Sequence, residues 1–382
     1  MKAKSIKGKS PEEIKKRLST SMSDGYKPIL AFVFLSGAQF IEEISNIMSD
    51  NGIQIFGATA IGEFNENGVE KDSIVILLFD IESSHFLIKF EDIIPENSEQ
   101  TAKIFATEGL AKFSNPAFII SVSNVKLPSE SILKGFKKVV GDNVTVIGGV
   151  ASDEDMLNGS RIFTNERISK QGLMCLVLNQ DKISVNGFAV SGWKPIGTIK
   201  TVTKSEGNRI FTIDDQPALD LIIKYTGIEV DLNNKKDLYN QLGSSMPLQI
   251  QKDEGSPVMN PPLMFNPSDH SVICGSVVPE GSKIRFSLPP DFDIIEDVIE
   301  NAKNAKLESI PKADALLVFS CIGRLEALGP LINSEIEGLQ EVWGVPMAGF
   351  FSFGEFGKTP GGKSEFHGTT CSWLTLTEKD NK

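Results

Sequence analysis

Short apolar runs recur along the chain in three pairs. The first run of each pair is rich in β-branched and aromatic residues, and its short length favours a β-strand over a helix. A second run of the same character follows in each case and predicts another strand. The first runs are PILAFVFLS (28–36), PAFIISVS (116–123) and ADALLVFSC (313–321), and the second are SIVILLFD (73–80), GLMCLVLN (172–179) and TTCSWLTL (369–376).

Amphipathic helices are predicted before and between these strands. In the segment 39–52, Ile41, Ile44 and Ile47 lie on one helical face, and the Asn-Gly pair at its end is a stop signal. Near the N-terminus, SPEEIKKRLSTSM has Ser10 as a helix cap, followed by proline and by a glutamate that completes a capping box. Similar patterns predict helices over 129–143 and 289–311.

A glycine followed six positions later by a glutamate occurs where a strand ends in each repeat. The three stretches are GATAIGE (57–63), GGVASDE (148–154) and GFFSFGE (349–355). Together with the runs above, they define a unit of helix, strand, helix, strand, loop and strand that is used three times. We therefore predict an α/β fold of repeated units with mixed sheets flanked by helices, in which similar units share a sheet or form matched halves.

A different region separates the second and third units. Residues 202–227 predict a hairpin and then a helix, and the Pro- and Gly-rich stretch after them predicts short antiparallel strands with long loops. We place a domain boundary near 215–235 and predict two domains, 26–220 and 221–378. They follow an N-terminal segment, 1–25, in which the basic residues KAKSIKGK form a solvated tail before the first helix.

Charge and composition exclude several classes of protein. The formal charge is −12, from 50 acidic and 38 basic residues, which argues against binding to nucleic acid. No apolar stretch reaches the roughly 18 to 20 residues that span a bilayer, and no secretory signal opens the chain. The four cysteines are scattered without CxxC spacing, so we expect no metal or other cofactor and a reduced, cytoplasmic setting.

The third unit carries the most varied chemistry. FSCIGRLEALG (319–329) places Cys321 at a strand end and Arg324 where a helix begins. The planar guanidinium of Arg324 is suited to a ligand carboxylate, although pairing with an internal acid is the alternative. Cys321 is either a nucleophile, with His367 as the one credible partner, or an inert buried thiol. No GxSxG, Walker, HExxH or strand-to-helix GxGxxG motif is present.

The glutamates and aromatic residues near the recurring loops are further candidates. A carboxylate such as Glu63 at the end of a strand can accept hydrogen bonds from an ammonium group, and a structural turn is the alternative. Of the aromatic residues in GFFSFGE, we expect one or two in the core and the rest, Phe351 among them, to line a pocket.

Several of these stretches resemble the FIST family, whose members join a FIST N-terminal to a FIST C-terminal domain. The resemblance runs from about residue 28 to 376. It is most specific in WKPIG through GNRI and in GFFSFGE, and it includes VIGGVASDE, FSCIGR and FHGTTCSWLTL. Ala58 and Ser152 depart from the pattern that we expect in the first two loops. The resemblance implies that the family's characteristic polar site residues correspond in this sequence to Glu63, Asp153, Cys321, Arg324, Glu355, His367 and Thr369.

The resemblance implies a sensory protein that binds small ligands, with amino acids as the proposed class. Relatives are often fused to kinase, cyclase or chemoreceptor modules. Because this sequence reaches Lys382 without such a module, we expect the output to pass through a separate signalling protein. In the leading hypothesis Arg324 takes the ligand carboxylate and Glu355 or Glu63 its ammonium group. The alternatives are an acyl- or amide-processing enzyme that uses Cys321 with His367, and an interaction scaffold without a ligand.

Overall fold

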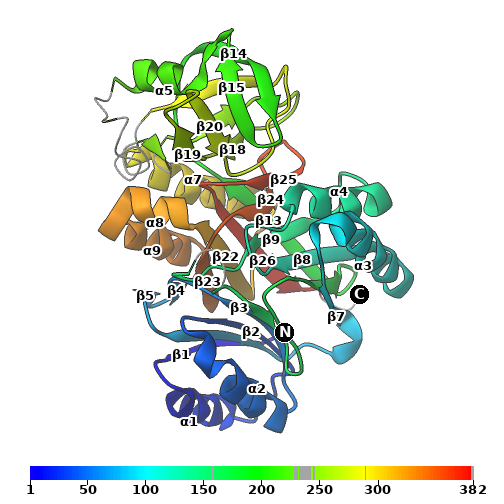
Figure 1. Ribbon diagram of the computed structural model, residues 1–382. Coiled ribbons are helices and arrows are strands. Elements are labelled where there is room, and N and C mark those ends of the chain that lie inside the picture. Colours follow the sequence, from blue (N-terminus) through cyan, green and yellow to red (C-terminus); the bar gives the residue numbers. More distant parts are fainter. Residues whose placement is uncertain (156–158, 228–230, 232–241, 244–245, 289, 380–382) are drawn as a thin grey trace.

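The computed structural model describes residues 1–155, 159–227, 231, 242–243, 246–288 and 290–379 (Figure 1). It contains three sheets of the same topology and a fourth, inserted sheet. The repeated units predicted from the apolar pattern are confirmed, but each unit builds a sheet of its own. Short 3-10 helices lie at Ala38–Phe40, Ser83–His85, Pro95–Asn97 and Gly329–Leu331.

The elements follow one another in the same order in every unit, with one additional helix, α8, in unit 3. Unit 1 comprises β1 (Ala3–Gly8), α1 (Pro11–Met22), β2 (Leu30–Leu35), α2 (Ile41–Asp50), β3 (Gln54–Thr59) and β6 (Ile74–Phe79). Unit 2 comprises β7 (Phe86–Asp92), α3 (Ser98–Lys112), β8 (Pro116–Val122), α4 (Ser129–Val140), β9 (Val146–Val150) and β12 (Gly172–Asn179). Unit 3 comprises β13 (Ile183–Val190), α7 (Asp293–Glu308), β22 (Ala315–Cys321), α8 (Ile322–Leu328), α9 (Ile332–Trp343), β23 (Met347–Ser352) and β26 (Cys371–Glu378).

The basic N-terminal residues form a strand, so the prediction of a solvated tail is wrong. Ala3–Gly8 pairs antiparallel with β6 at the edge of the first sheet. Ile6 and Gly8 are buried, while the two lysines of the strand, Lys4 and Lys7, remain partly accessible. Because an edge strand buries only alternate residues, its few apolar positions were hidden among the lysines. Half of the predicted capping box of α1 is present: Ser10 Oγ accepts from Glu13 N at 3.3 Å, but the Glu13 carboxylate accepts from Lys9 N, at 2.7 Å, and not from Ser10 N.

A short hairpin from each unit pairs with the sheet of another unit. The hairpin of unit 1, β4 (Glu63–Asn65) and β5 (Gly68–Glu70), pairs with β23 of unit 3. That of unit 2, β10 (Ile162–Phe163) and β11 (Ile168–Ser169), pairs with β3 of unit 1. That of unit 3, β24 (Glu355–Lys358) and β25 (Ser364–His367), pairs with β9 of unit 2. These exchanged hairpins link the units in a closed cycle.

The three sheets surround one shared core. Phe34 of unit 1 packs on Phe350 and Phe319 of unit 3, with ring centroids 4.7 and 6.3 Å apart. The same cluster contains Ile119 of unit 2. The opposite face of each sheet packs on helices of its own unit, α1 and α2, α3 and α4, or α7 and α9. Each sheet is thus buried on both faces, which accounts for its nearly continuous apolar strands.

The fourth sheet is inserted in unit 3 between β13 and α7. It lies at the top of Figure 1, at the opposite end from α1 and α2. Residue 220, the predicted end of the first domain, lies within α5, a helix that packs on this sheet. The insertion comprises β14 (Pro195–Glu206), β15 (Arg209–Ile213), β16 (Gln216–Pro217), α5 (Ala218–Thr226), β17 (Leu248–Ile250), β18 (Val258–Asn260), β19 (Pro262–Asn266), β20 (Ser271–Cys274) and β21 (Lys283–Ser287). No helix in the described ranges is both long and apolar enough to cross a membrane.

Candidate functional site

The recurring glycines support the exchanged hairpins. Gly57 and Gly349 are matched by register in their sheets, and each lies opposite a phenylalanine from another unit. A Cβ atom on Gly57 would lie 2.4 Å from Phe163, and one on Gly349 would lie 2.2 Å from Phe64. A side chain at either position would therefore displace the ring of the incoming hairpin.

The glutamates at 63 and 355 begin the exchanged hairpins and occupy matching positions. Each lies immediately before the packed phenylalanine of its hairpin. In unit 2 that position is Ile162, because the chain passes through a longer loop before its hairpin begins. The glutamate of GGVASDE is therefore not the counterpart of Glu63 and Glu355. Asp153 lies in that loop, where its Oδ1 accepts from Asp155 N at 3.0 Å.

Both glutamates are fully buried and join strand ends of their own unit. Glu63 accepts hydrogen bonds from Ser36 Oγ at 2.8 Å and Ser73 N at 2.7 Å. Burial raises the pKa of Glu63 to about 7. The Glu63 side chain thus links two chain segments of unit 1 to each other and does not face a cleft.

Glu355 has the corresponding partners in unit 3. It accepts from Ser352 Oγ at 2.6 Å and from Thr370 Oγ1 at 2.9 Å, and the Cys321 thiol adds a further hydrogen bond. Burial raises the pKa of Glu355 to about 8. Both carboxyls are therefore mainly or partly protonated near neutral pH.

These pKa shifts predict that the fold loses stability as the pH rises. Each carboxyl keeps a proton in the folded state that the unfolded chain, with an ordinary pKa of 4.5, has already lost. For Glu355 the loss extends to about pH 8, with a slope of at most about 1.4 kcal/mol per pH unit. We expect Glu355→Gln to flatten the dependence of the free energy of unfolding on pH, measured in urea between pH 6.5 and 8.

The window above pH 6.5 separates this effect from that of His367. Burial lowers the pKa of His367 to about 4, so its opposite contribution to stability ends near its ordinary value of 6.5. Glu337→Gln on the exposed face of α9 is the control and should leave the slope unchanged. A slope that is equal in wild type and Glu355→Gln would contradict the prediction.

Arg324 is held by an internal acid, the alternative left open by its sequence. It is fully buried and forms an ion pair with Glu335 of α9. Its other N–H groups donate to the carbonyl oxygens of Ser191 (2.6 Å), Thr369 (3.3 Å) and Ile294 (3.2 Å). With these bonds every guanidinium N–H is engaged, so Arg324 has no donor left for a ligand carboxylate.

Cys321 and His367 do not form the pair that the enzyme alternative requires. The thiol lies beside Glu355 and the backbone N–H groups of Gly323 and Thr369. Burial, followed by the nearby Glu355, raises the pKa of Cys321 well above its ordinary value, so the sulfur stays a thiol. His367 directs Nε2–H to the carbonyl of Gly357 at 3.3 Å.

The remaining predicted residues also lie inside the protein. Phe351 packs on Phe64, with ring centroids 5.2 Å apart, and is fully buried. Thr369 has a left-handed backbone (φ 53°) and a buried hydroxyl without a partner in the described part of the chain. Ser152, one of the two departures from the family pattern, accepts from Ile61 N at 3.0 Å and donates to the carbonyl of Phe351. It therefore connects all three units.

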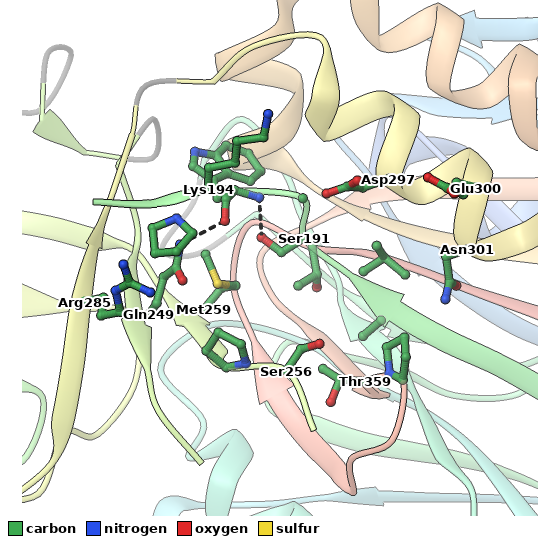
Figure 2. Close-up of a pocket in the computed structure, with 18 of the residues that line it drawn as sticks. Ser191, Lys194, Gln249, Ser256, Met259, Arg285, Asp297, Glu300, Asn301 and Thr359 are labelled. Carbon is green, nitrogen blue, oxygen red and sulfur yellow. Dashed lines mark hydrogen bonds between the residues drawn. The ribbon is translucent and has the colours of Figure 1, made fainter. Parts of the chain in front are cut away.

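The accessible site lies in front of this buried network, in what we call the α7 cleft. The cleft has a volume of about 540 Å³ and lies between α7 and the inserted sheet (Figure 2). One wall is the connection from β13 to β14, which Arg324 supports from behind through Ser191. Thr370 also lines the cleft and links it to Glu355. The two opposite walls are lined by Asp297, Glu300, Asn301 and Asn304 of α7 and by Gln249, Met259 and Arg285 of the insertion.

The α7 wall carries three side chains with acceptor oxygens. Asp297, Glu300 and Asn301 share one face of the helix, as their spacing requires. Burial and the neighbouring Glu300 raise the pKa of Asp297. The Oδ1 atom of Asn301 is buried and has no hydrogen-bond partner among the residues that the structure describes. This wall therefore suits a group that brings positive charge and hydrogen-bond donors, such as an ammonium.

The opposite wall carries a cation. Arg285 donates from Nε and Nη2 to the carbonyl of Gly197, at 3.2 and 2.9 Å. Its Nη1 has no hydrogen-bond partner within the described ranges, so it is available to an anionic group. Gln249 is fixed by bonds to Trp193 O (2.9 Å) and Ser287 Oγ (3.1 Å), which hold the insertion against the β13–β14 connection. The cleft therefore combines an acidic wall and a basic wall on braced elements.

Sequence reasoning missed most of this surface. The residues of α7 were predicted only for the apolar face of the helix, and those of β17 and β21 lie in short strands without a motif. One signal did point to the cleft: WKPIG, among the stretches most specific to the family resemblance, begins at Trp193 and Lys194 in its wall.

Comparisons with known proteins identify relatives of this chain and the family to which it belongs. An uncharacterized protein of Mycobacterium bovis is 25% identical over 238 residues, which cover 61% of this chain and 60% of that protein. An uncharacterized protein of Mycobacterium tuberculosis is 25% identical over 243 residues, or 61% of each chain. The match thus spans about three fifths of these relatives. The family models for the FIST N domain and the FIST C domain match residues 29–216 and 218–358. The chain belongs to the FIST family.

Proposed function

We propose that this protein is a sensor that binds a small zwitterionic molecule, an amino acid being the simplest, in the α7 cleft. FIST domains are sensory domains of signal transduction, which supports the general role. The observation that carries the choice of ligand is the buried Oδ1 atom of Asn301, which has no partner in the described part of the chain and lies beside Asp297 and Glu300. An ammonium group there would satisfy the amide oxygen and relieve the repulsion between the two carboxylates.

The ligand carboxylate would lie toward Arg285 on the other wall. A guanidinium N–H and a carboxylate form a charge-assisted hydrogen bond, which is stronger than a neutral one. The proposal keeps the pairing of a cation and an acid that the sequence led us to expect. It moves both roles from Arg324, Glu355 and Glu63 to the accessible residues Arg285, Asp297 and Glu300.

Ligand binding would act on the contact between the insertion and unit 3, because the cleft is formed by both. We propose that a separate signalling protein, such as a kinase or a cyclase, reads this contact. The free thiols of all four cysteines support a reducing, cytoplasmic setting.

The test is thermal unfolding with a panel of amino acids and with the amine and the carboxylic acid of each matching carbon skeleton. A ligand at about 100 times its dissociation constant adds roughly 2.7 kcal/mol to the stability of the folded state. We expect a selective rise of the midpoint with one or a few amino acids. Asp297→Asn should weaken that ligand about tenfold, since it removes a charge-assisted hydrogen bond.

Glu296→Gln is the matched control, because Glu296 lies on the same helix but not among the residues lining the cleft. It should leave the affinity unchanged. A midpoint that no member of the panel raises would favour the scaffold hypothesis. A shift of equal size in Asp297→Asn and wild type would place the ligand elsewhere.

A further inference from the structure

A second cleft lies in unit 2 at the place that corresponds to the α7 cleft. In both units the cleft opens where the outermost strand ends and its antiparallel partner begins. These points are Asp92 and Gly172 for β7 and β12, and Val190 and Cys371 for β13 and β26. The cleft in unit 2, which we call the α3 cleft, has a volume of about 610 Å³. It is lined by Asp92, Ile93, Ile94, Asn97, Asn124, Lys126, Ser160, Ile168, Ser169, Lys170 and Gln171.

The α3 cleft contains a buried serine hydroxyl, that of Ser160. Ser160 is 1% exposed, and its Oγ has no hydrogen-bond partner within the ranges that the structure covers. The neighbouring polar side chains are already fixed: Asn124 accepts from Lys126 N at 2.9 Å, and Ser169 accepts from Gln171 N at 3.0 Å. An unmade hydrogen bond in a built polar wall indicates a ligand atom that completes it.

The charged side chains that line the cleft are mainly basic, in contrast to the α7 wall, and the Asp153 carboxylate lies close to the neighbouring Gly159. Lys126 and Lys170 line the cleft, and Lys170 has no ion-pair partner among the described residues. Among the described residues of the lining the one acid is Asp92, which is paired with Arg167 at 3.5 Å. Asn97 is the N-cap of α3, and the N-terminus of a helix of this length adds a favourable field for an anion.

The rim of the cleft is apolar. Ile94 is 51% exposed and Ile168 is 45% exposed, and both line the cleft beside the buried Ile93. Aliphatic side chains at the edge of a polar pocket favour a ligand with a hydrocarbon part next to its polar head.

We propose that the α3 cleft is a second binding site, which takes a short aliphatic carboxylate. The carboxylate accepts hydrogen bonds from the Ser160 hydroxyl and Lys170 Nζ, and the alkyl chain covers Ile94 and Ile168. The internal repeat thus provides two clefts at matching positions, one with an acidic and a basic wall beside α7 and one with a basic lining beside α3. This inference does not depend on the function proposed for the α7 cleft.

The test is binding of 4-methylpentanoate to the full chain, measured by saturation-transfer NMR and by equilibrium dialysis. We expect Lys170→Gln to weaken binding about tenfold and Ser160→Ala to weaken it several-fold, because each removes a hydrogen bond to the anion. The amine of the same skeleton, 4-methylpentylamine, should not compete. Lys303→Gln, an exposed lysine on α7, is the matched control for loss of one positive charge and should bind as wild type does.

Arg285→Gln separates the two clefts. Binding that is kept in Arg285→Gln but weakened in Lys170→Gln assigns the carboxylate to the α3 cleft, whatever the outcome for amino acids. Equal affinity in wild type, Lys170→Gln and Ser160→Ala would overturn the proposal, as would loss of binding in Arg285→Gln. Urea unfolding of each variant checks that the fold is intact. Because Lys170 is exposed, Lys170→Gln should leave the unfolding midpoint unchanged, even if Ser160→Ala lowers it.

Discussion

Replacing Arg324 by alanine is expected to lower the free energy of unfolding by about 3 to 5 kcal/mol. The change leaves the Glu335 carboxylate fully buried without its cation. It also removes the donors that satisfy the carbonyl oxygens of Ser191, Thr369 and Ile294. Chemical unfolding at pH 7 measures the loss, and Arg17→Ala on the exposed face of α1 serves as the control for removal of a guanidinium.

A second variant distinguishes the ion pair from the carbonyl contacts. Arg324→Met combined with Glu335→Leu removes both charges together, so the penalty for an isolated buried carboxylate disappears. We expect the double variant to recover part of the lost stability but not all of it, because the carbonyls of Ser191 and Thr369 stay without the donors that Arg324 supplied. A loss below about 1 kcal/mol in Arg324→Ala would show that the pair is not the support we describe.

The same substitution should also affect the α7 cleft. Arg324 holds the carbonyl of Ser191, and its guanidinium carbon lies 5.3 Å from the centre of the Trp193 ring. Ser191 and Trp193 both line the cleft. Arg324 is thus a positioning residue, and its loss should weaken any ligand of the cleft even under conditions where the variant is folded.

The repeated framework was predictable because its signal is local. The inner strands of each unit, such as β2, β8 and β22, are apolar runs bounded by turn residues. Helices α2 and α4 each show apolar positions at helical spacing. These patterns require no knowledge of distant parts of the chain. β1 escaped prediction for the opposite reason: it is an edge strand with few buried positions among lysines.

The exchange of hairpins was not predictable from the same signals. Strand β10 has two residues and β4 has three, too few to show a period of two. Their partners are remote, as in the pairing of Glu63 with Phe350. The recurrence of glycine and glutamate marked the right place, but its interpretation as a set of ligand-facing loops needed the partner strand to be known.

The candidate site illustrates the same limit. A carboxylate at the end of a strand, such as Glu355, has the same sequence signature whether it faces a ligand or a neighbouring hydroxyl. Its burial depends on where the exchanged hairpin lies. The residues of the α7 cleft, such as Asp297 and Arg285, come together only because the inserted sheet folds back on α7, and no local pattern contains that information.

Replacing Gly57 by alanine is expected to destabilise the fold by about 3 kcal/mol, because the new methyl group collides with the exchanged hairpin of unit 2. The nearest atoms to a Cβ at this position all belong to Phe163, at 2.4 to 2.7 Å. Phe163 is fully buried between β3 and the helices of unit 1, so the ring cannot move aside without a packing cost. Urea unfolding measures the loss. Gly275→Ala is the control, since its Cβ would meet nothing closer than 3.6 Å.

A double-mutant cycle ties this cost to the exchange of hairpins. Phe163→Ala alone should cost about 3 to 5 kcal/mol through the cavity that it leaves. In that background the added methyl group has room, so Gly57→Ala should cost less than about 1 kcal/mol, which gives a coupling of about 2 kcal/mol or more. Additive losses would mean that the ring of Phe163 does not lie on Gly57. The contact between Gly57 and the hairpin of unit 2 would then be missing. The recurrence of this glycine would have to be explained by contacts within its own unit.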